Sequence, residues 1–199
     1  MIVLLTDFGL EGPYAGQVEA VLHRQAPGVP VVNLFSDLSP FDIQSAAYLL
    51  PAYTGRLPPG TVCLCVVDPG VGGERPGCVV AAGGRWYVGP DEGLFTLLAR
   101  QSGSISGYHL PVVHEASPSF HGRDVFAPAA AWLARQGRVN DNWEAADLAM
   151  CDDWPDDLLR VLYIDRFGNA ITGLRASAVA ASVVLQVNGH ELRRAVTFS

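Results

Sequence analysis

The chain has 199 residues, of which 49% are hydrophobic and 17% are charged, a composition that excludes a disordered or fibrous protein. Its formal net charge of −7 argues against a nucleic-acid-binding protein, because such a protein needs a basic face. The apolar run near the amino terminus is too short for a signal peptide or a membrane span, and the four cysteines lack C-x-x-C spacing, so a cytoplasmic location with reduced thiols is expected.

The first third of the chain alternates strand and helix signals. Residues 2–5 form an apolar run that predicts a buried strand and leads to Asp7. An amphipathic helix is predicted from about Pro13, since proline suits the first turn of a helix. The run 29–35 predicts the next strand, and Asp42 is placed to cap a second helix at its amino end.

The middle of the chain continues this alternation. Residues 61–67 (TVCLCVV) predict a strand that is buried on both faces. Gly83-Gly84 separates two β-type runs, which is typical of a hairpin. A helical stretch follows Gly93, and a further helix begins near Asp124 and ends at Gly137, a predicted C-cap.

These signals predict two domains. Strands alternating with helices indicate a layered α/β domain with a mostly parallel sheet over residues 1–150. The acidic stretch 151–159 contains Pro155 and is predicted to be a linker. Residues 160–199 have β character and a hairpin signal at Asn188-Gly189, and they are expected to form a partial β-rich domain that is too small to be stable alone.

The loop after the predicted strand 61–67 carries the most informative residues. Asp68 ends the strand, and a glycine-rich loop separates it from Arg75. Charged residues delivered from the carboxyl end of a buried strand are where open α/β sheets build binding sites. A salt bridge that only braces the turn is the alternative interpretation.

Three other loops bring polar residues out of the apolar chain. They carry Asp7, Asp91 and the segment 119–124 (SFHGRD). His121 stands in that tight segment at the start of a predicted helix, which distinguishes it from the other histidines and makes it a candidate functional residue.

Five motifs in order resemble one enzyme family. TDFG, VVDPGVGGER, GPDEG, SFHGRDVFAPAAA and YIDRFGN together resemble the S-adenosylmethionine hydroxide adenosyltransferases, relatives of fluorinase and chlorinase. The resemblance implies hydrolysis of S-adenosylmethionine to adenosine and L-methionine, by SN2 attack of an activated water or hydroxide at the ribose C5′. A sulfonium leaves readily without a general acid, so positioning and desolvation of the reactants would provide most of the catalysis.

The resemblance also implies roles for individual residues. Asp68, Arg75 and His121 match the family's water-activating triad, and Asp7 matches the acceptor for the ribose hydroxyls. The other substrate-binding residues that it implies are Phe8, Phe41, Gly122, Asp165 and Asn169. It implies no metal and no cofactor besides the substrate, and it implies a homotrimer with its sites at subunit interfaces.

The chain departs from the family pattern at several positions. Gly12 stands where the family usually has Asp, Ser36 stands where it has His, and Glu92 stands where the family's PDNG motif has Asn. The sequence also stops at Ser199, short of the family's usual length, so adenine recognition and trimer assembly are expected to be affected.

Two other functions remain open from the sequence. One is a protein that binds S-adenosylmethionine or adenosine without turnover because its second domain is short. The other is a metal-dependent hydrolase that uses Asp7, Asp68, Asp91 and His121. A halogenase is disfavoured, because a halide nucleophile needs no proton removal. P-loop and dinucleotide-binding functions are excluded, since neither glycine motif is present.

Overall fold

The computed structural model describes residues 1–180 and 182–192, and its chain divides into two compact units. The first unit spans Met1–Trp154 and the second spans Pro155–Ser199, so the boundary lies within the stretch predicted as a linker.

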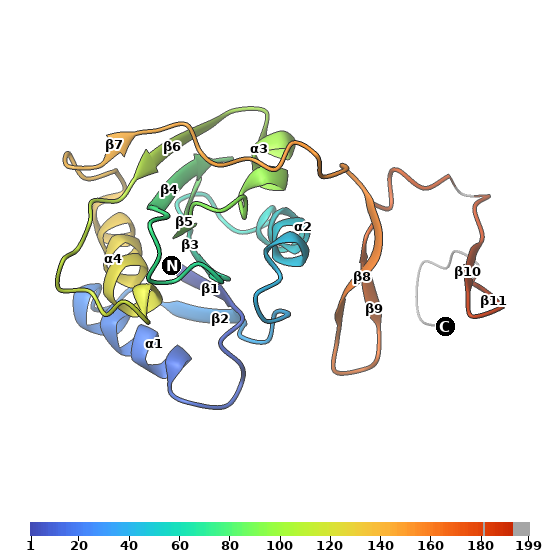
Figure 1. Ribbon diagram of the computed structural model, residues 1–199, viewed down its shortest axis with the longest axis horizontal. Coiled ribbons are helices and arrows are strands. Elements are labelled where there is room, and N and C mark those ends of the chain that lie inside the picture. Colours follow the sequence, from blue (N-terminus) through green and yellow to red (C-terminus); the bar gives the residue numbers. More distant parts are fainter. Residues whose placement is uncertain (181, 193–199) are drawn as a thin grey trace. The chain divides into compact units, whose positions relative to one another are not determined.

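The first unit is built on a seven-stranded sheet with the order β2-β1-β3-β5-β4-β6-β7 (Figure 1). Strands β2, β1, β3 and β5 run parallel, while β4, β6 and β7 extend the sheet through antiparallel pairs. The strands are β1 (Ile2–Thr6), β2 (Val31–Phe35), β3 (Val62–Val66), β4 (Gly77–Ala82), β5 (Arg85–Pro90), β6 (Ile105–His109) and β7 (Glu144–Ala145). Every residue of β1 and β3 is buried, which confirms the two central strands predicted from their apolar runs.

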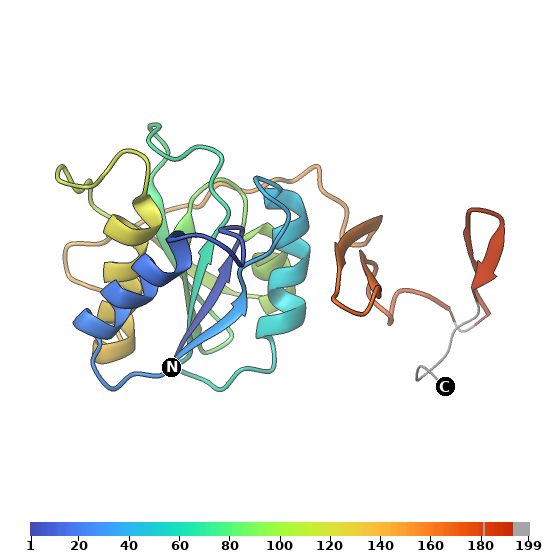
Figure 2. The ribbon, with the colours of Figure 1, turned by 90° about the horizontal axis from the view of Figure 1, so that it is seen from below.

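Helices cover both faces of this sheet, which confirms the layered α/β class (Figure 2). Helices α1 (Tyr14–Gln25) and α4 (Ala127–Gln136) pack together on one face, and α2 (Ile43–Thr54) and α3 (Thr96–Ser102) pack on the other. Asp42 caps α2 as predicted, because its side chain accepts a hydrogen bond from the Ser45 amide. The burial of apolar side chains between these layers holds the strand ends at fixed positions.

Strand β6 and the form of the last helix's first turn were not predicted. Strand β6 is short and contains Ser106 and Gly107, so it carries little β signal, and backbone pairing with β4 recruits it to the sheet. The start of the last helix is a π-helix, Gly122–Phe126, rather than regular α-helix. Such wide turns occur often at functional sites, and this one directly follows His121.

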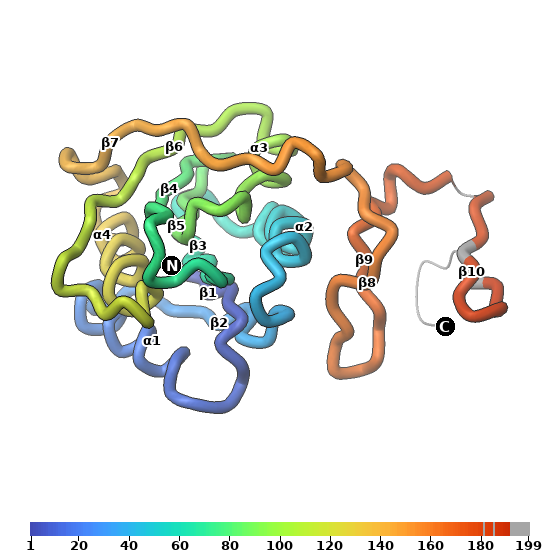
Figure 3. The backbone as a smooth tube through the Cα atoms, in the orientation of Figure 1, coloured from blue at the N-terminus to red at the C-terminus, as the bar shows by residue number. Residues whose placement is uncertain are grey.

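The segment that follows α4 runs back along the unit and passes α3 (Figure 3). Arg100 on α3 fixes it there, since its guanidinium donates to the carbonyl oxygens of Cys151 and Trp154. No helix in the described part of the chain has the length and apolar composition needed to span a membrane.

The second unit contains two small antiparallel sheets in its described residues. Strands β8 (Leu158–Ile164) and β9 (Ala170–Gly173) form one, and β10 (Leu185–Val187) and β11 (His190–Leu192) form the other. Asn188 and Gly189 join β10 to β11 with positive φ angles of 49° and 81°, which confirms the predicted hairpin turn.

Candidate active site

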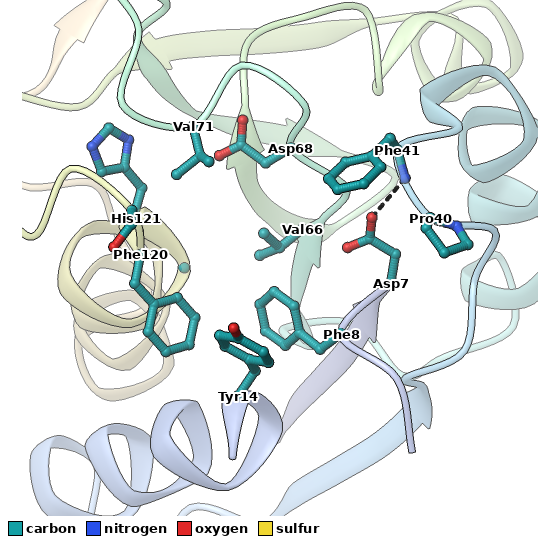
Figure 4. Close-up of a pocket in the computed structure, with 12 residues that line it drawn as sticks. Asp7, Phe8, Tyr14, Pro40, Phe41, Val66, Asp68, Val71, Phe120 and His121 are labelled. Atoms are coloured by element: carbon teal, nitrogen blue, oxygen red, sulfur yellow. Dashed lines mark hydrogen bonds between the residues drawn. The ribbon is translucent and has the colours of Figure 1, made fainter. Parts of the chain in front are cut away.

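The loops that leave the carboxyl ends of β1 and β3 meet the loop that precedes α4 at one end of the sheet (Figure 2). They enclose a pocket of about 300 Å³ (Figure 4). Asp7 follows β1, Asp68 follows β3, and His121 begins the turn into α4, so the topology brings three predicted site residues to one cavity. The lining residues are Asp7, Phe8, Tyr14, Pro40, Phe41, Val66, Asp68, Val71, Ser119, Phe120, His121 and Gly122.

Asp68 and Arg75 form a buried, bidentate ion pair at the wall of this pocket. Arg75 donates from Nε to Asp68 Oδ1 at 2.8 Å and from Nη2 to Asp68 Oδ2. The two side chains are 6% and 8% exposed, and the guanidinium lies 5.3 Å from the centre of the Phe126 ring. Arg75 does not itself line the pocket, whereas its partners Asp68 and His121 do.

His121 completes a continuous network with this pair. Its Nδ1 lies 3.1 Å from Arg75 Nη2. A guanidinium only donates hydrogen bonds, so Nδ1 is the acceptor and the neutral ring carries its proton on Nε2. Burial lowers the pKa of His121 below its usual value, and the positive charge of Arg75 lowers it further. The ring is therefore neutral at neutral pH.

Local contacts fix the loop that carries His121. Asp124 accepts a hydrogen bond from the Ser117 amide and pairs with Arg123, which also donates to Gln17 on α1. The first contact joins the two ends of the segment around His121, and the contact with Gln17 ties that segment to α1. A Cβ at Gly122 would lie 3.0 Å from the Phe8 ring, so a side chain there would require the ring to shift.

Asp7 lies across the pocket from His121, next to Phe41 (Figure 4). Its Oδ2 accepts a hydrogen bond from the Phe41 amide at 2.8 Å. Burial raises the pKa of Asp7. Phe41 has a φ of 61° and is 68% exposed, so its backbone is held in a rare conformation while its ring stands at the pocket mouth.

An aromatic cluster forms another side of the pocket. The Phe8 and Phe120 rings lie 5.7 Å apart in a T-shaped arrangement, and Tyr14 lies 5.4 Å from Phe120 and 6.2 Å from Phe8. Such faces are suited to packing against a planar or apolar ligand group. Tyr14 and Phe120 were not among the predicted site residues. Their sequence signals, a helix start and a position beside His121, do not by themselves indicate a ligand contact.

Asp91 does not join the site. Its Oδ2 lies 2.9 Å from His109 Nε2, and its Oδ1 accepts a hydrogen bond from the Ala149 amide, so it ties β6 and the returning segment to the end of β5. Across residues 1–180 and 182–192, no three His, Cys, Asp or Glu side chains are placed to hold one metal ion. The metal-dependent alternative assigned Asp91 to the site together with Asp7, Asp68 and His121, and Asp91 is not among the residues that line the pocket.

Asp165 and Asn169 lie in the second unit and form a closed turn between β8 and β9. Asn169 donates from Nδ2 to Asp165 Oδ2 at 2.7 Å, and Asp165 Oδ1 accepts from the amides of Phe167 and Asn169. These hydrogen bonds lower the pKa of Asp165. Their role in substrate binding stays a prediction.

The two departures near the first loops have local explanations in the fold. Gly12 has a φ of 98°, a conformation that favours glycine, and no atom lies within 4 Å of the position a Cβ would take. Ser36 is buried and exchanges hydrogen bonds with Asn33, so it stabilises the end of β2. Neither residue lines the pocket described above.

Comparison with known proteins relates the chain to a defined family. A family model for the SAM hydroxide adenosyltransferase N-terminal domain matches residues 2–142. An (R)-S-adenosyl-L-methionine hydrolase from Thermus thermophilus is 42% identical over 99% of this chain and 82% of its own length. A fluorinase from Actinoplanes sp. is 23% identical over 71% of this chain and 56% of its own length.

The fold is shared with solved structures as well. An uncharacterised conserved protein from Thermotoga maritima superposes with a TM-score of 0.84 at 27% identity, and the match covers 98% of this chain and 83% of that one. The two proteins therefore share the same overall fold.

Proposed function

The chain belongs to the SAM hydroxide adenosyltransferase family, and from this membership we propose that it hydrolyses S-adenosylmethionine to adenosine and L-methionine by SN2 displacement at the ribose C5′. The observation that carries the proposal is the continuous Asp68–Arg75–His121 network at the wall of the pocket. A salt bridge that only braced a turn would not need to extend to a histidine on a distant loop.

The network is suited to generating a hydroxide nucleophile. The neutral His121 ring presents an Nε2–H that can hold a water oxygen, while Nδ1 is occupied by Arg75. The buried positive charge of Arg75 stabilises hydroxide relative to water, and Asp68 keeps the guanidinium in place. The proton leaves to solvent, since Nδ1 of His121 is occupied by Arg75 and Nε2 already carries a proton.

The displacement itself places few demands on the protein. The hydroxide oxygen forms a bond to C5′ as the C5′–sulfur bond breaks, and the electron pair of that bond returns to sulfur. The cationic sulfonium thus becomes the neutral thioether of methionine. Because the leaving group needs no proton, the pocket has only to align the reactants and exclude bulk water.

Asp7 and the aromatic residues are proposed to bind the nucleoside. A carboxylate accepts two ribose hydroxyls well, and Asp7 lies across the pocket from His121. Phe8, Phe41 and Gly122 line the same pocket and would contact the ribose and its neighbouring groups. Asp165 and Asn169 are proposed to contribute from a second unit, as the family resemblance implies.

The name of the Thermus thermophilus relative specifies the R form of the sulfonium substrate. We extend that preference to this chain. Incubation with each separated sulfonium epimer tests it, and equal rates for the two epimers would contradict it.

Three further features are proposed from the resemblance. These are a metal-independent reaction, a homotrimer with sites at subunit interfaces, and a cytoplasmic location. The free thiols of Cys63, Cys65 and Cys78 are buried, which suits a reducing compartment. Leu10 and Phe41, which are 79% and 68% exposed near the pocket loops, suit a site that another chain covers. Sedimentation analysis tests the oligomeric state.

One assay tests the proposed activity and separates it from the alternatives. The purified protein is incubated with S-adenosylmethionine, with and without a chelator, and adenosine and methionine are followed by chromatography. Chelator-resistant release of both products in equal amounts is expected. Binding without product would indicate a non-catalytic binding protein, and loss of activity on chelation would indicate a metal-dependent hydrolase.

A further inference from the structure

Glu92 lies beside the Asp68–Arg75 pair but outside the pocket wall. It follows β5, and its Oε1 is 3.9 Å from Arg75 Nε. The carboxylate lies against Gly70 so closely that a Cβ on Gly70 would overlap with Oε1. Glycine at position 70 therefore allows a second carboxylate to approach the arginine of the triad.

The interaction between Glu92 and Arg75 is electrostatic and involves no hydrogen bond. Arg75 uses Nε and Nη2 for Asp68, shares Nη2 with His121, and directs Nη1 to the Pro76 carbonyl at 3.3 Å. At 3.9 Å, Glu92 Oε1 is too far from Nε for a hydrogen bond but close enough for strong Coulomb attraction.

Glu92 is partly shielded from solvent and surrounded by charge. The charged groups that face it among the described residues are Arg75 and Asp68 on the glycine loop and Asp91 beside it. Burial raises the pKa of Glu92, the Asp68 carboxylate raises it further, and Arg75 opposes both effects. Its side chain is 23% exposed, so its charge is screened less than that of a surface glutamate.

We propose that Glu92 is a positioning residue that sets the net charge of the triad. Its ionised carboxylate offsets part of the positive charge of Arg75, and together with Asp68 it leaves two carboxylates around one guanidinium. A hydroxide beside the triad is then less stabilised than it would be by Asp68 and Arg75 alone. This inference rests on the proposed function, because it concerns the nucleophile of that reaction.

The expected consequence is a shift in the pH dependence of turnover. Replacing Glu92 by Gln removes the charge but keeps an oxygen that can accept from the Gly70 amide. Hydroxide forms at lower pH in E92Q, so the rise of kcat with pH moves to lower pH. At a pH below the midpoint, kcat is expected to increase about threefold, the effect of one charge at a distance of several ångströms in a partly screened site.

A second measurement does not depend on activity. The ring of His121 contacts the same guanidinium, so loss of the Glu92 charge makes the net charge beside the ring more positive and lowers the titration midpoint of His121. This midpoint is followed by NMR of the imidazole signals in the free protein, with the assignment made from a His121→Asn variant. The matched control is Glu74→Gln, which removes the same charge from an exposed position next to Arg75 on the glycine loop.

The outcomes separate this inference from the proposed function. A lower His121 midpoint and a kcat profile moved to lower pH in E92Q, with neither change in E74Q, support the role of Glu92. A His121 midpoint that is the same in E92Q and E74Q overturns it, even if the thermal melting temperature changes. If the unaltered protein releases no adenosine, the proposed function fails, while the His121 titration still decides whether Glu92 sets the charge of the triad.

Discussion

Gly72 lies directly against the carbonyl group of Pro118, with no room for a Cβ between them. This contact joins the glycine loop that carries Asp68 and Arg75 to the loop that carries His121. The two loops are far apart in the sequence, since Arg75 and His121 are separated by 46 positions. The 3.1 Å contact between Arg75 and His121 therefore depends on a close backbone approach that glycine permits.

Replacing Gly72 by Ala should disrupt the triad. Gly72 has a φ of +80°, so alanine is strained there in addition to meeting Pro118. We expect a loss of about 2 kcal/mol or more in the free energy of unfolding and a marked loss of turnover. Gly12→Ala is the control, since Gly12 also has positive φ but open space around it, and it should cost about 1 kcal/mol. Equal effects of the two variants, measured by urea unfolding, would show that the contact with Pro118 is unimportant.

Replacing Arg75 by Lys should impair both stability and activity. Lysine retains the positive charge but cannot make the bidentate contact with Asp68 or reach His121 in the same geometry. We expect kcat to fall about 100-fold and the free energy of unfolding to fall by about 2 kcal/mol.

The control for Arg75→Lys is Arg138→Lys. Arg138 forms an exposed ion pair with Asp141 at 2.9 Å, so its replacement should change stability by less than about 1 kcal/mol. Full activity of the Arg75 variant in the adenosine release assay would show that the proposed triad is wrong.

His121 should make activity and stability depend on pH in the acid range. Its pKa in the fold lies below the ordinary value of 6.5, so the unfolded chain takes up the proton first as the pH falls. The contribution of His121 to the free energy of unfolding is complete above pH 6.5. It is lost as the pH falls from 6.5 through the lower pKa that His121 has in the folded protein. Turnover should fall over the same range, because a protonated ring cannot accept from Arg75.

This pH effect is measured by denaturant unfolding at pH 7.5 and pH 5.5. The difference in the free energy of unfolding between the two pH values should be smaller in His121→Asn than in the unaltered protein. His23→Asn, on the exposed side of α1, is the control and should leave the difference unchanged. His121→Ala should also lower turnover by about 100-fold at neutral pH.

Asp7→Asn should weaken substrate binding and stabilise the fold. Burial raises the pKa of Asp7, so keeping it ionised at neutral pH costs free energy in the folded state, and this cost disappears as the pH falls through the raised pKa. Asparagine can still accept from the Phe41 amide without that cost. We expect the free energy of unfolding at pH 7 to rise by about 0.5 kcal/mol and KM to increase at least about tenfold.

Thermal melting and the adenosine release assay check both parts of this prediction. Asp42→Asn, which preserves the cap of α2, is the control and should leave KM unchanged. An Asp7 variant with unaltered KM would remove Asp7 from the proposed binding residues.

The local pattern of the chain determined most of the fold. Apolar runs predicted the buried strands β1 and β3, Asp42 marked the start of α2, and the glycine pair at 83–84 marked the β4–β5 hairpin. These features follow from backbone preferences and burial, which act within a few residues of the chain. Strand β6 escaped prediction because pairing with β4, rather than its own composition, makes it a strand.

Residue order and motifs also indicated Asp68, Arg75 and His121, but tertiary structure alone decided how these side chains are arranged. Only folding places Nη2 of Arg75 against Nδ1 of His121, and this contact fixes the tautomer of the ring, while burial and the charge of Arg75 lower its pKa. Folding likewise removes Asp91 from the site, since its carboxylate is taken by His109 and the Ala149 amide. It also places Glu92 next to Arg75, because Gly70 has no side chain to block the approach of the carboxylate. Such contacts depend on distances between loops that are remote in the sequence, whereas sequence patterns report mainly the local preferences of each segment.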